Sequence, residues 1–165
     1  MKFNRCSLVA GLLAAFACSS LLAGCASKGS KQMQVLKESD KFYDAYLNGE
    51  ADTARRSLEQ AIRLFQSPRA DILEPSGHAG ILYFTYARLY ALEKRTGNDP
   101  AAAVALAAAR SWNEKRYQLA GETNSTSLEE CRLFDTPEKI VEVADKLDKA
   151  ATSGKGPKYI HMTQK

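Results

Sequence analysis

The feature of this chain that most constrains its fold is the helical spacing of its apolar residues, which starts near residue 33 and continues almost to residue 152. Apolar side chains recur at intervals of three and four residues, the period of an α-helix that buries one face. No alternating run is long enough to predict a strand with this pattern. The sequence therefore predicts an all-α domain over residues 33–152, built from antiparallel helical hairpins.

Turn residues divide the first part of this pattern into two helices. Asn48-Gly49 ends the first helix, with a glycine suited to a left-handed helix exit, and Asp52 can cap the second. Ser67-Pro68 then stops the second helix. The residues expected to face the core are Val35, Phe42, Tyr46 and Leu47, flanked by Leu36 and Tyr43, on the first helix, and Ala54, Leu58, Ala61, Ile62 and Phe65 on the second.

Further helices follow. Pro75-Ser76-Gly77 closes a loop, and a third helix runs over about 78–95. The run Gly97-Asn98-Asp99-Pro100 provides a stop, a cap and a first-turn proline for a fourth helix, in which seven alanines between 101 and 109 let a neighbouring backbone approach closely. Ser127 starts a short helix and Asp135-Thr136-Pro137 the last one. The core-facing residues expected here are Ile81, Leu82, Phe84, Leu89 and Leu92, then Ile140, Val143, Ala144 and Leu147.

The first predicted hairpin resembles a known repeat family. The run from Tyr46 to Ala54, followed by Leu58 and Ala61, resembles the turn and second helix of a tetratricopeptide repeat. A weaker match covers 90–97 with two later alanines. The two matches are offset by 49 residues, whereas the repeat has about 34. Two architectures stay open, a tetratricopeptide-like array and an ordinary small helix bundle.

The N-terminal segment has the layout of an export signal, with Lys2 and Arg5 before an apolar stretch over 8–22. Leu22-Ala23-Gly24-Cys25 resembles the lipobox of bacterial lipoprotein precursors. The resemblance implies that the signal peptidase recognises Leu22, Ala23 and Gly24, that residues 1–24 are removed, and that Cys25 is acylated. The alternative is an uncleaved membrane helix, but the apolar run is interrupted at 18–20 and is shorter than the roughly 20 residues that span a bilayer.

This resemblance also implies a location and a first partner. An acylated Cys25 would hold the protein in the bacterial cell envelope through its lipid, and Ala26, where an aspartate would retain the protein at the inner membrane, favours the periplasmic face of the outer membrane. Residues 25–32 are expected to form the acylated cysteine and a flexible tether. Residues 153–165 are expected to form a loosely held tail, with a possible short extended piece at 159–162.

Charge and composition exclude several classes of function. Two of the 23 basic residues lie in the leader, so the remaining chain has a charge of about +2 against its 19 acids, which argues against a nucleic-acid partner. Cys131 is expected to be a small buried residue. The sequence has no Ser-His-Asp constellation, phosphate loop or metal-ligand spacing, so we expect no catalytic residues, no cofactor and no metal, and not an enzyme.

Two groups of side chains are candidates for partner binding. Tyr83, Tyr86 and Tyr90 fall on one face of the third helix, where they form either an aromatic strip lining a groove or a core stripe with hydroxyls at its edge. Arg56 and Arg63 belong to an arginine-rich second helix and either pair with a partner's carboxylates or are ordinary solvated charges.

The anchor and the helical hairpins together favour a scaffold or accessory subunit that binds another protein of a cell-envelope assembly. The alternative is a lipoprotein that handles a small ligand or lipid in an apolar pocket between helices, lined by Phe84, Tyr86 and Trp112. The two hypotheses differ because only the second one expects those three side chains to enclose a cavity.

Overall fold

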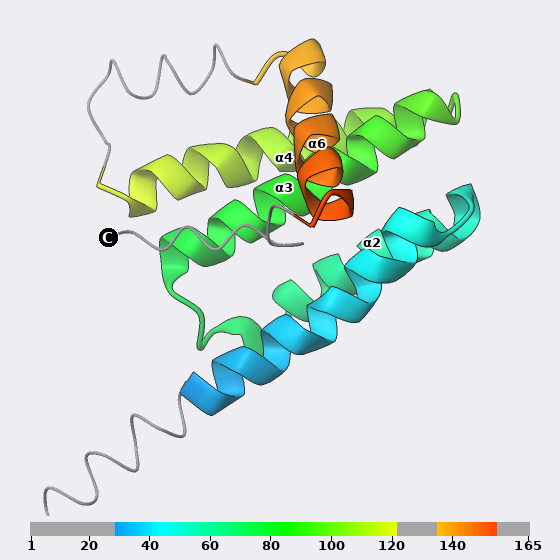
Figure 1. The fold of residues 1–165 in the computed structure, drawn as a ribbon. Helices are drawn as coiled ribbons and strands as arrows, with labels where there is room; N and C mark the ends of the chain where they lie inside the picture. Colours follow the sequence, from blue (N-terminus) through cyan, green and yellow to red (C-terminus); the bar gives the residue numbers. More distant parts are fainter. Residues whose placement is uncertain (1–28, 122–134, 155–165) are drawn as a thin grey trace, which may run out of the picture.

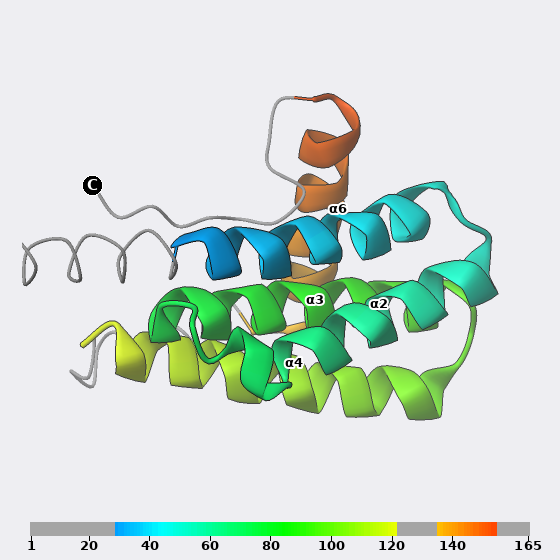
Figure 2. The ribbon, with the colours of Figure 1, turned by 90° about the horizontal axis from the view of Figure 1, so that it is seen from below.

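The computed structural model describes residues 29–121 and 135–154, and over these ranges the protein is all-α (Figure 1). The first helix covers residues 29–48. It is followed by α2 (Ala51–Phe65), a short 3₁₀ turn η1 (Pro68–Ala70), α3 (Pro75–Arg95), α4 (Asp99–Leu119) and α6 (Pro137–Thr152). The first helix and α2 run antiparallel, as do α3 and α4, and α6 crosses these hairpins (Figures 1 and 2). The predicted all-α fold of helical hairpins is confirmed.

The first helix, α2 and α3 share one apolar core. The whole stripe predicted on α2 is buried, with Leu58, Ala61 and Phe65 inaccessible to solvent. On the first helix, however, Leu36 and Tyr43 lie at the centre of the buried face, while Phe42 and Leu47 are only partly buried. Val35 and Tyr46 are buried as predicted, so the prediction is confirmed in part, and the buried face extends toward Leu36 and Tyr43 because this helix packs against α3 as well as against α2.

The helical domain extends further toward the N-terminus than the sequence suggested. Residues 29–32, expected in the flexible tether, belong to the first helix. The side-chain amide of Gln32 donates a hydrogen bond to the carbonyl of Ile72, at 3.0 Å, and so ties this helix to the segment after η1. These residues are polar, and their polarity led to the prediction of a tether. They are nevertheless helical, and Gln32 is fixed by this tertiary contact.

The turn between the first helix and α2 differs from its prediction in two ways. Gly49 has no positive φ; a Cβ at this position would instead lie 2.5 Å from the carbonyl oxygen of Ala45 and 2.9 Å from a methyl of Thr53. Glycine is thus required here for close approach and not for a left-handed exit. Asp52 is not the N-cap of α2, which is Glu50. The Asp52 carboxylate pairs with Arg55 at 2.7 Å.

The start of α3 was placed too late. Pro75 lies in the first turn of α3, where its missing N–H leaves no hydrogen bond unmade. The carboxylate of Glu74 caps the helix by accepting from the backbone N–H groups of Ser76, at 3.0 Å, and Gly77, at 2.6 Å. These two N–H groups hold the pKa of Glu74 below its usual range. A Pro-Ser-Gly run is typical of loops, and glutamate is an uncommon cap, so the signal was misread.

Small residues bring α3 and α4 close together. Gly97 adopts a positive φ of 74° between them and reverses the chain, as predicted. Ala87 and Ala91 of α3 are buried, and α4 contributes Ala102, Ala105 and Ala109 to the same core. The outer alanines, such as Ala103, are exposed. The alanine-rich sequence of α4 therefore serves close helix packing on one face only.

The last helix, α6, crosses α3 and completes the second core. The hydroxyl of Thr136 accepts a hydrogen bond from the backbone N–H of Lys139, at 3.3 Å, and so caps α6. Ile140 and Ala144 are fully buried, whereas Val143 and Leu147 are only partly so. Because α3 contacts α2, α4 and α6, it is the central helix of the fold.

Several predictions concern segments outside the described residues. These are the leader with its lipobox, the short helix begun by Ser127, the burial of Cys131 and the tail from 155 onward, including the extended piece at 159–162. Leu119, the last residue of α4, is 45% exposed.

The close packing of α3 against α4 can be tested with two substitutions on one helix. Ala105→Leu forces three extra carbon atoms into a packed interface, and we expect it to lower the free energy of unfolding by about 1–3 kcal/mol. Ala103→Leu, on the exposed face of α4, is the matched control and should change stability by less than about 0.5 kcal/mol. Urea unfolding followed by circular dichroism measures both. Equal effects of the two substitutions would contradict the packing described here.

Candidate functional site

The three tyrosines predicted on one face of α3 do not form an exposed strip. Tyr83 and Tyr90 are 4% and 5% exposed and belong to the core that α3 shares with α4 and α6. Tyr86 is partly exposed, and its hydroxyl accepts a hydrogen bond from the side-chain amide of Gln66, at 3.2 Å. Of the three, only Tyr86 is more than slightly exposed in the described structure.

The two candidate arginines lie on the outer face of α2. Arg56 is exposed and approaches the hydroxyl of Thr53 at 3.5 Å, while Arg63 is 3.9 Å from Glu59 within the same helix. Neither distance corresponds to a strong hydrogen bond. The two arginines are not brought together with Tyr83 and Tyr90, which lie in the core of the second hairpin.

The side chains proposed for an apolar ligand pocket are also part of the packing. Phe84 packs on Tyr83 with ring centroids 4.9 Å apart. Trp112 lies beside His78 at 6.3 Å, and a His78 ring nitrogen is 2.5 Å from the carbonyl oxygen of Phe65. Both Tyr86 and Trp112 pack against the two apolar cores. These side chains therefore contribute to the packing between the helices.

The structure instead brings together a buried charged cluster, which holds α6 to the rest of the fold. The Arg88 side chain of α3 is 2% exposed, and its Nε donates to Oδ1 of Asp148 in α6, at 2.8 Å. The hydroxyl of Tyr46, in the first helix, donates to Oδ2 of the same carboxylate, at 2.5 Å. One carboxylate of α6 is thereby shared by two other helices. We call Arg88, Asp148, Tyr43, Tyr46 and Thr85 the Arg88 cluster.

Aromatic faces complete the environment of this buried cation. The Arg88 guanidinium lies over the rings of Tyr43 and Tyr46, at 4.9 and 5.9 Å from their centroids, which adds cation–π attraction to the ion pair. The hydroxyl of Thr85 donates to the carbonyl of Ile81 at 2.7 Å, so the Tyr43 hydroxyl, 2.6 Å away, is the donor toward Thr85. The hydroxyls of Tyr43, Tyr46 and Thr85 and the Nε of Arg88 thus each have a hydrogen-bond partner.

Both tyrosines of the cluster hold their protons tightly. Burial raises the pKa of the Tyr43 hydroxyl above its usual value. Burial also raises the pKa of Tyr46, and the negative charge of Asp148 raises it further. The neighbouring cation of Arg88 opposes both shifts without cancelling them. These hydroxyls therefore act as hydrogen-bond donors at neutral pH and not as bases.

A surface hollow of about 400 Å³ lies next to the Arg88 cluster, at the end of the bundle away from Gly29. Its lining is partly apolar, and Arg95, Asp148 and Lys149 contribute charged groups to it. We call it the far-end hollow. Its lining residues are Tyr46, Leu47, Gly49, Ala51, Ala54, Leu92, Arg95, Asp148, Lys149 and Thr152.

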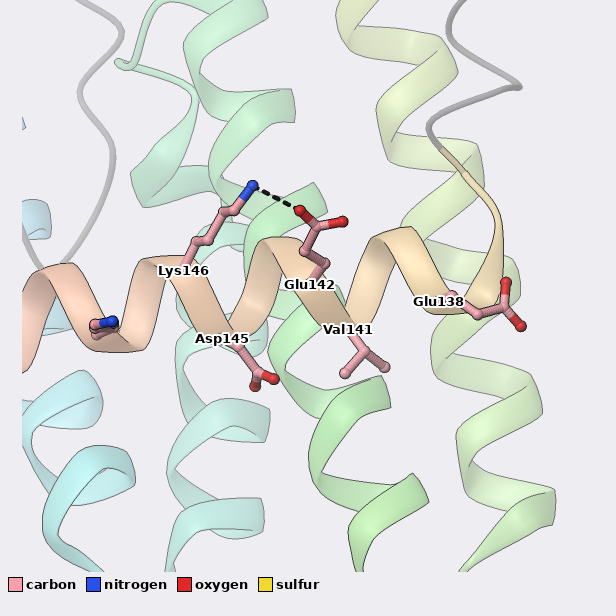
Figure 3. A pocket seen from close by; sticks show the side chains of 6 residues that line it. Glu138, Val141, Glu142, Asp145 and Lys146 are labelled. Carbon is pink, nitrogen blue, oxygen red and sulfur yellow. Dashed lines mark hydrogen bonds and ion pairs between the residues drawn. The ribbon is translucent and has the colours of Figure 1, made fainter.

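A second hollow, of about 380 Å³, runs along α6 itself and shares Lys149 with the first (Figure 3). It is lined by Glu138, Val141, Glu142, Asp145, Lys146 and Lys149. Figure 3 shows Val141 among these charged side chains and the ion pair between Lys146 and Glu142. Lys139 and Lys146 together hold the pKa of Glu142 down, to about 2, so this carboxylate stays charged. The two hollows make the surface around α6 a mixed apolar and charged face.

Sequence reasoning missed the pairing of Arg88 with Asp148. A signal was present in α3, because Thr85 and Arg88 occupy the core-facing positions that follow Ile81 at helical spacing. A polar pair at such positions indicates a buried partner elsewhere in the chain. What the sequence did not identify is the partner, since Asp148 lies 60 residues away on α6.

No group of three metal-ligating side chains occurs among residues 29–121 and 135–154, and within those ranges no helix is long and apolar enough to cross a membrane. The carboxylate and hydroxyls of the Arg88 cluster are occupied by one another. The residues around the two hollows are suited to contacting an apolar group that carries charges of either sign.

Comparison with known proteins gives no family model, no curated protein and no solved structure that matches this chain.

The Arg88 cluster generates a stability prediction with a control on the same helix. Asp148→Asn leaves the cation of Arg88 buried without its counter-charge, and we expect a loss of about 3–5 kcal/mol in the free energy of unfolding. Asp145→Asn removes an exposed pair with Arg95 and should cost less than about 1 kcal/mol. Chemical denaturation of both variants gives the comparison. A similar small loss in both would show that the buried pair does not hold α6.

The tyrosines generate a pH dependence. Below about pH 10 they are protonated in both states, so their contribution to stability is fully present. Above that value they ionise in the unfolded chain first, because folding raises the pKa of both hydroxyls, and stability is lost as the pH rises further. Urea unfolding at about pH 9 and about pH 11 should show this loss, and a Tyr43→Phe/Tyr46→Phe variant should show a smaller one. An equal loss in the variant would assign the effect to other groups.

Proposed function

We propose that the protein is a lipid-anchored helical scaffold or accessory subunit, which holds another protein of a bacterial envelope assembly near the membrane, at the periplasmic face of the outer membrane. The observation that carries the proposal is the lipobox cysteine, Cys25, placed immediately before a helical domain. Tetratricopeptide-like pairing of its hairpins is the more specific form of the same proposal.

The short distance between the anchor and the domain supports this role. Four residue steps separate Cys25 from Gly29, where the described helical part begins. A fully extended chain covers at most about 3.3–3.6 Å per residue, so the domain starts no more than about 14 Å from the lipid-bearing cysteine. Acyl chains contribute about 0.8 kcal/mol per buried methylene, and two or more give a lasting anchor. The domain would thus remain at the membrane surface.

The surface around α6 supports a protein partner. The Arg88 cluster fixes α6 across both hairpins, and a rigid α6 borders both hollows. The far-end hollow combines apolar lining residues such as Leu47 and Leu92 with the charged Arg95 and Lys149, and protein interfaces likewise combine apolar and charged groups. We therefore place the partner-binding surface at α6 and not at Arg56 and Arg63 on α2.

The anchor is tested by intact-mass analysis of the protein isolated from bacterial membranes. The wild-type chain should lack residues 1–24 and carry a diacylglyceryl group on Cys25. Cys25→Ser should abolish the lipid and block removal of the leader. Cys18→Ser, a cysteine within the leader, is the matched control and should leave the mature mass unchanged. A wild-type chain with an unmodified Cys25 would contradict the proposal.

The partner surface is tested by a photo-crosslinking amino acid introduced in living cells. At Lys149, which lines both hollows, we expect one discrete adduct with the same protein in every replicate. At Arg63, on the exposed face of α2, we expect none. An adduct at Arg63 alone would move the binding surface to α2, and no adduct at either position would overturn the scaffold role.

A further inference from the structure

The three large apolar side chains that stand out in solvent are unevenly distributed over the described structure. Met33, at the start of the first helix, is 50% exposed, and Leu119, at the end of α4, is 45% exposed. Val104, near the start of α4, is 70% exposed. Figures 1 and 2 both show the start of the first helix, the start of α3 and the end of α4 at one end of the bundle. Met33 and Leu119 therefore share that end, while Val104 lies at the other.

This end is also the one that a lipid on Cys25 would hold at the bilayer. Met33 lies one helical turn beyond Gly29, about 6 Å along the helix axis, so with the extended linker it is at most about 20 Å from the anchored cysteine. An apolar side chain at that distance from the headgroups gains free energy by entering the boundary between headgroups and acyl chains. Met33 is thus both exposed to solvent and close to the anchored cysteine.

We infer that the bundle docks end-on to the lipid surface, with Met33 and Leu119 inserted at the headgroup boundary. The inference rests on the proposed acylation of Cys25 and adds an orientation to it. The occupant of this surface is the phospholipid bilayer itself. In this orientation α4, with 21 residues, extends about 30 Å from the membrane surface. The far-end hollow then lies at the end of the bundle away from the lipid.

Among the described residues, the charges at this end do not select a lipid of one sign. Lys31 and Lys115 are exposed there, and their long side chains can reach the headgroups. Asp71 and Glu74 lie at the same end and oppose them. Apolar insertion therefore carries the docking, which is expected to be equally strong on vesicles of zwitterionic lipid and on vesicles with a fraction of anionic lipid.

The test uses nitroxide spin labels at positions 33, 119 and 104, introduced as Met33→Cys, Leu119→Cys and Val104→Cys in a Cys131→Ser background. Each acylated protein is reconstituted in phosphatidylcholine vesicles and in vesicles that also contain phosphatidylglycerol. The reference is the same labelled chain without residues 1–24 and with Cys25→Ser, in solution. The accessibility of each label to oxygen and to a water-soluble nickel complex is measured.

End-on docking predicts that the labels at 33 and 119 become more accessible to oxygen and less to nickel on both kinds of vesicle, while the label at 104 keeps its solution values. A change at 119 and 104 together would place α4 flat on the membrane, and a change at 33 alone would lay down the first helix. Either result, or no change at any label, overturns the inference. Intact mass of each sample reports acylation separately, so a lipid-bearing chain that fails to dock contradicts the orientation and leaves the anchor intact.

Discussion

The fold depends on the buried guanidinium of Arg88. A cation that is 2% exposed, in the central helix of the bundle, is stable only if a carboxylate and hydrogen-bonding groups surround it. Asp148 supplies the charge from α6, and the Tyr46 hydroxyl fixes the other oxygen of that carboxylate. Three helices far apart in sequence are therefore joined at one point. Without it, α6 would keep the burial of Ile140 and Ala144, the exposed pair between Asp145 and Arg95, and the hydrogen bonds of Asp135 with α4, but no buried charge pair with α3.

Two further features of the bundle determine where a partner bound at α6 would lie. The alanine faces of α3 and α4 let these two helices pack closely against each other in the second hairpin. The positions of the cysteine and of Met33 and Leu119 make the two ends of the bundle unlike each other, since one end adjoins the proposed lipid and the other carries the far-end hollow. A scaffold with this polarity would hold a partner about one helix length from the membrane.

Much of the fold could be predicted from local patterns. The helix breaks at Asn48 and Gly97 and the buried stripe of α2 follow from periodicity and turn chemistry that neighbouring residues determine. One error arose where tertiary contacts decide, because the first helix packs against α3 as well as α2. The other two were local signals that were misread: Glu74 caps α3, and Gly49 is needed for close approach to Ala45. The candidate site was the least predictable part, because the pairing of Arg88 with Asp148 spans 60 residues and no local signal identifies the partner of a buried charge.

The most direct test of this account is the coupling free energy between Arg88 and Asp148 in a double-mutant cycle with Arg88→Met and Asp148→Leu. The account predicts that each single variant is strongly destabilised and that the double variant recovers much of the loss, because apolar side chains of similar size leave no buried charge without a partner. Losses that simply add would contradict the central role of this ion pair.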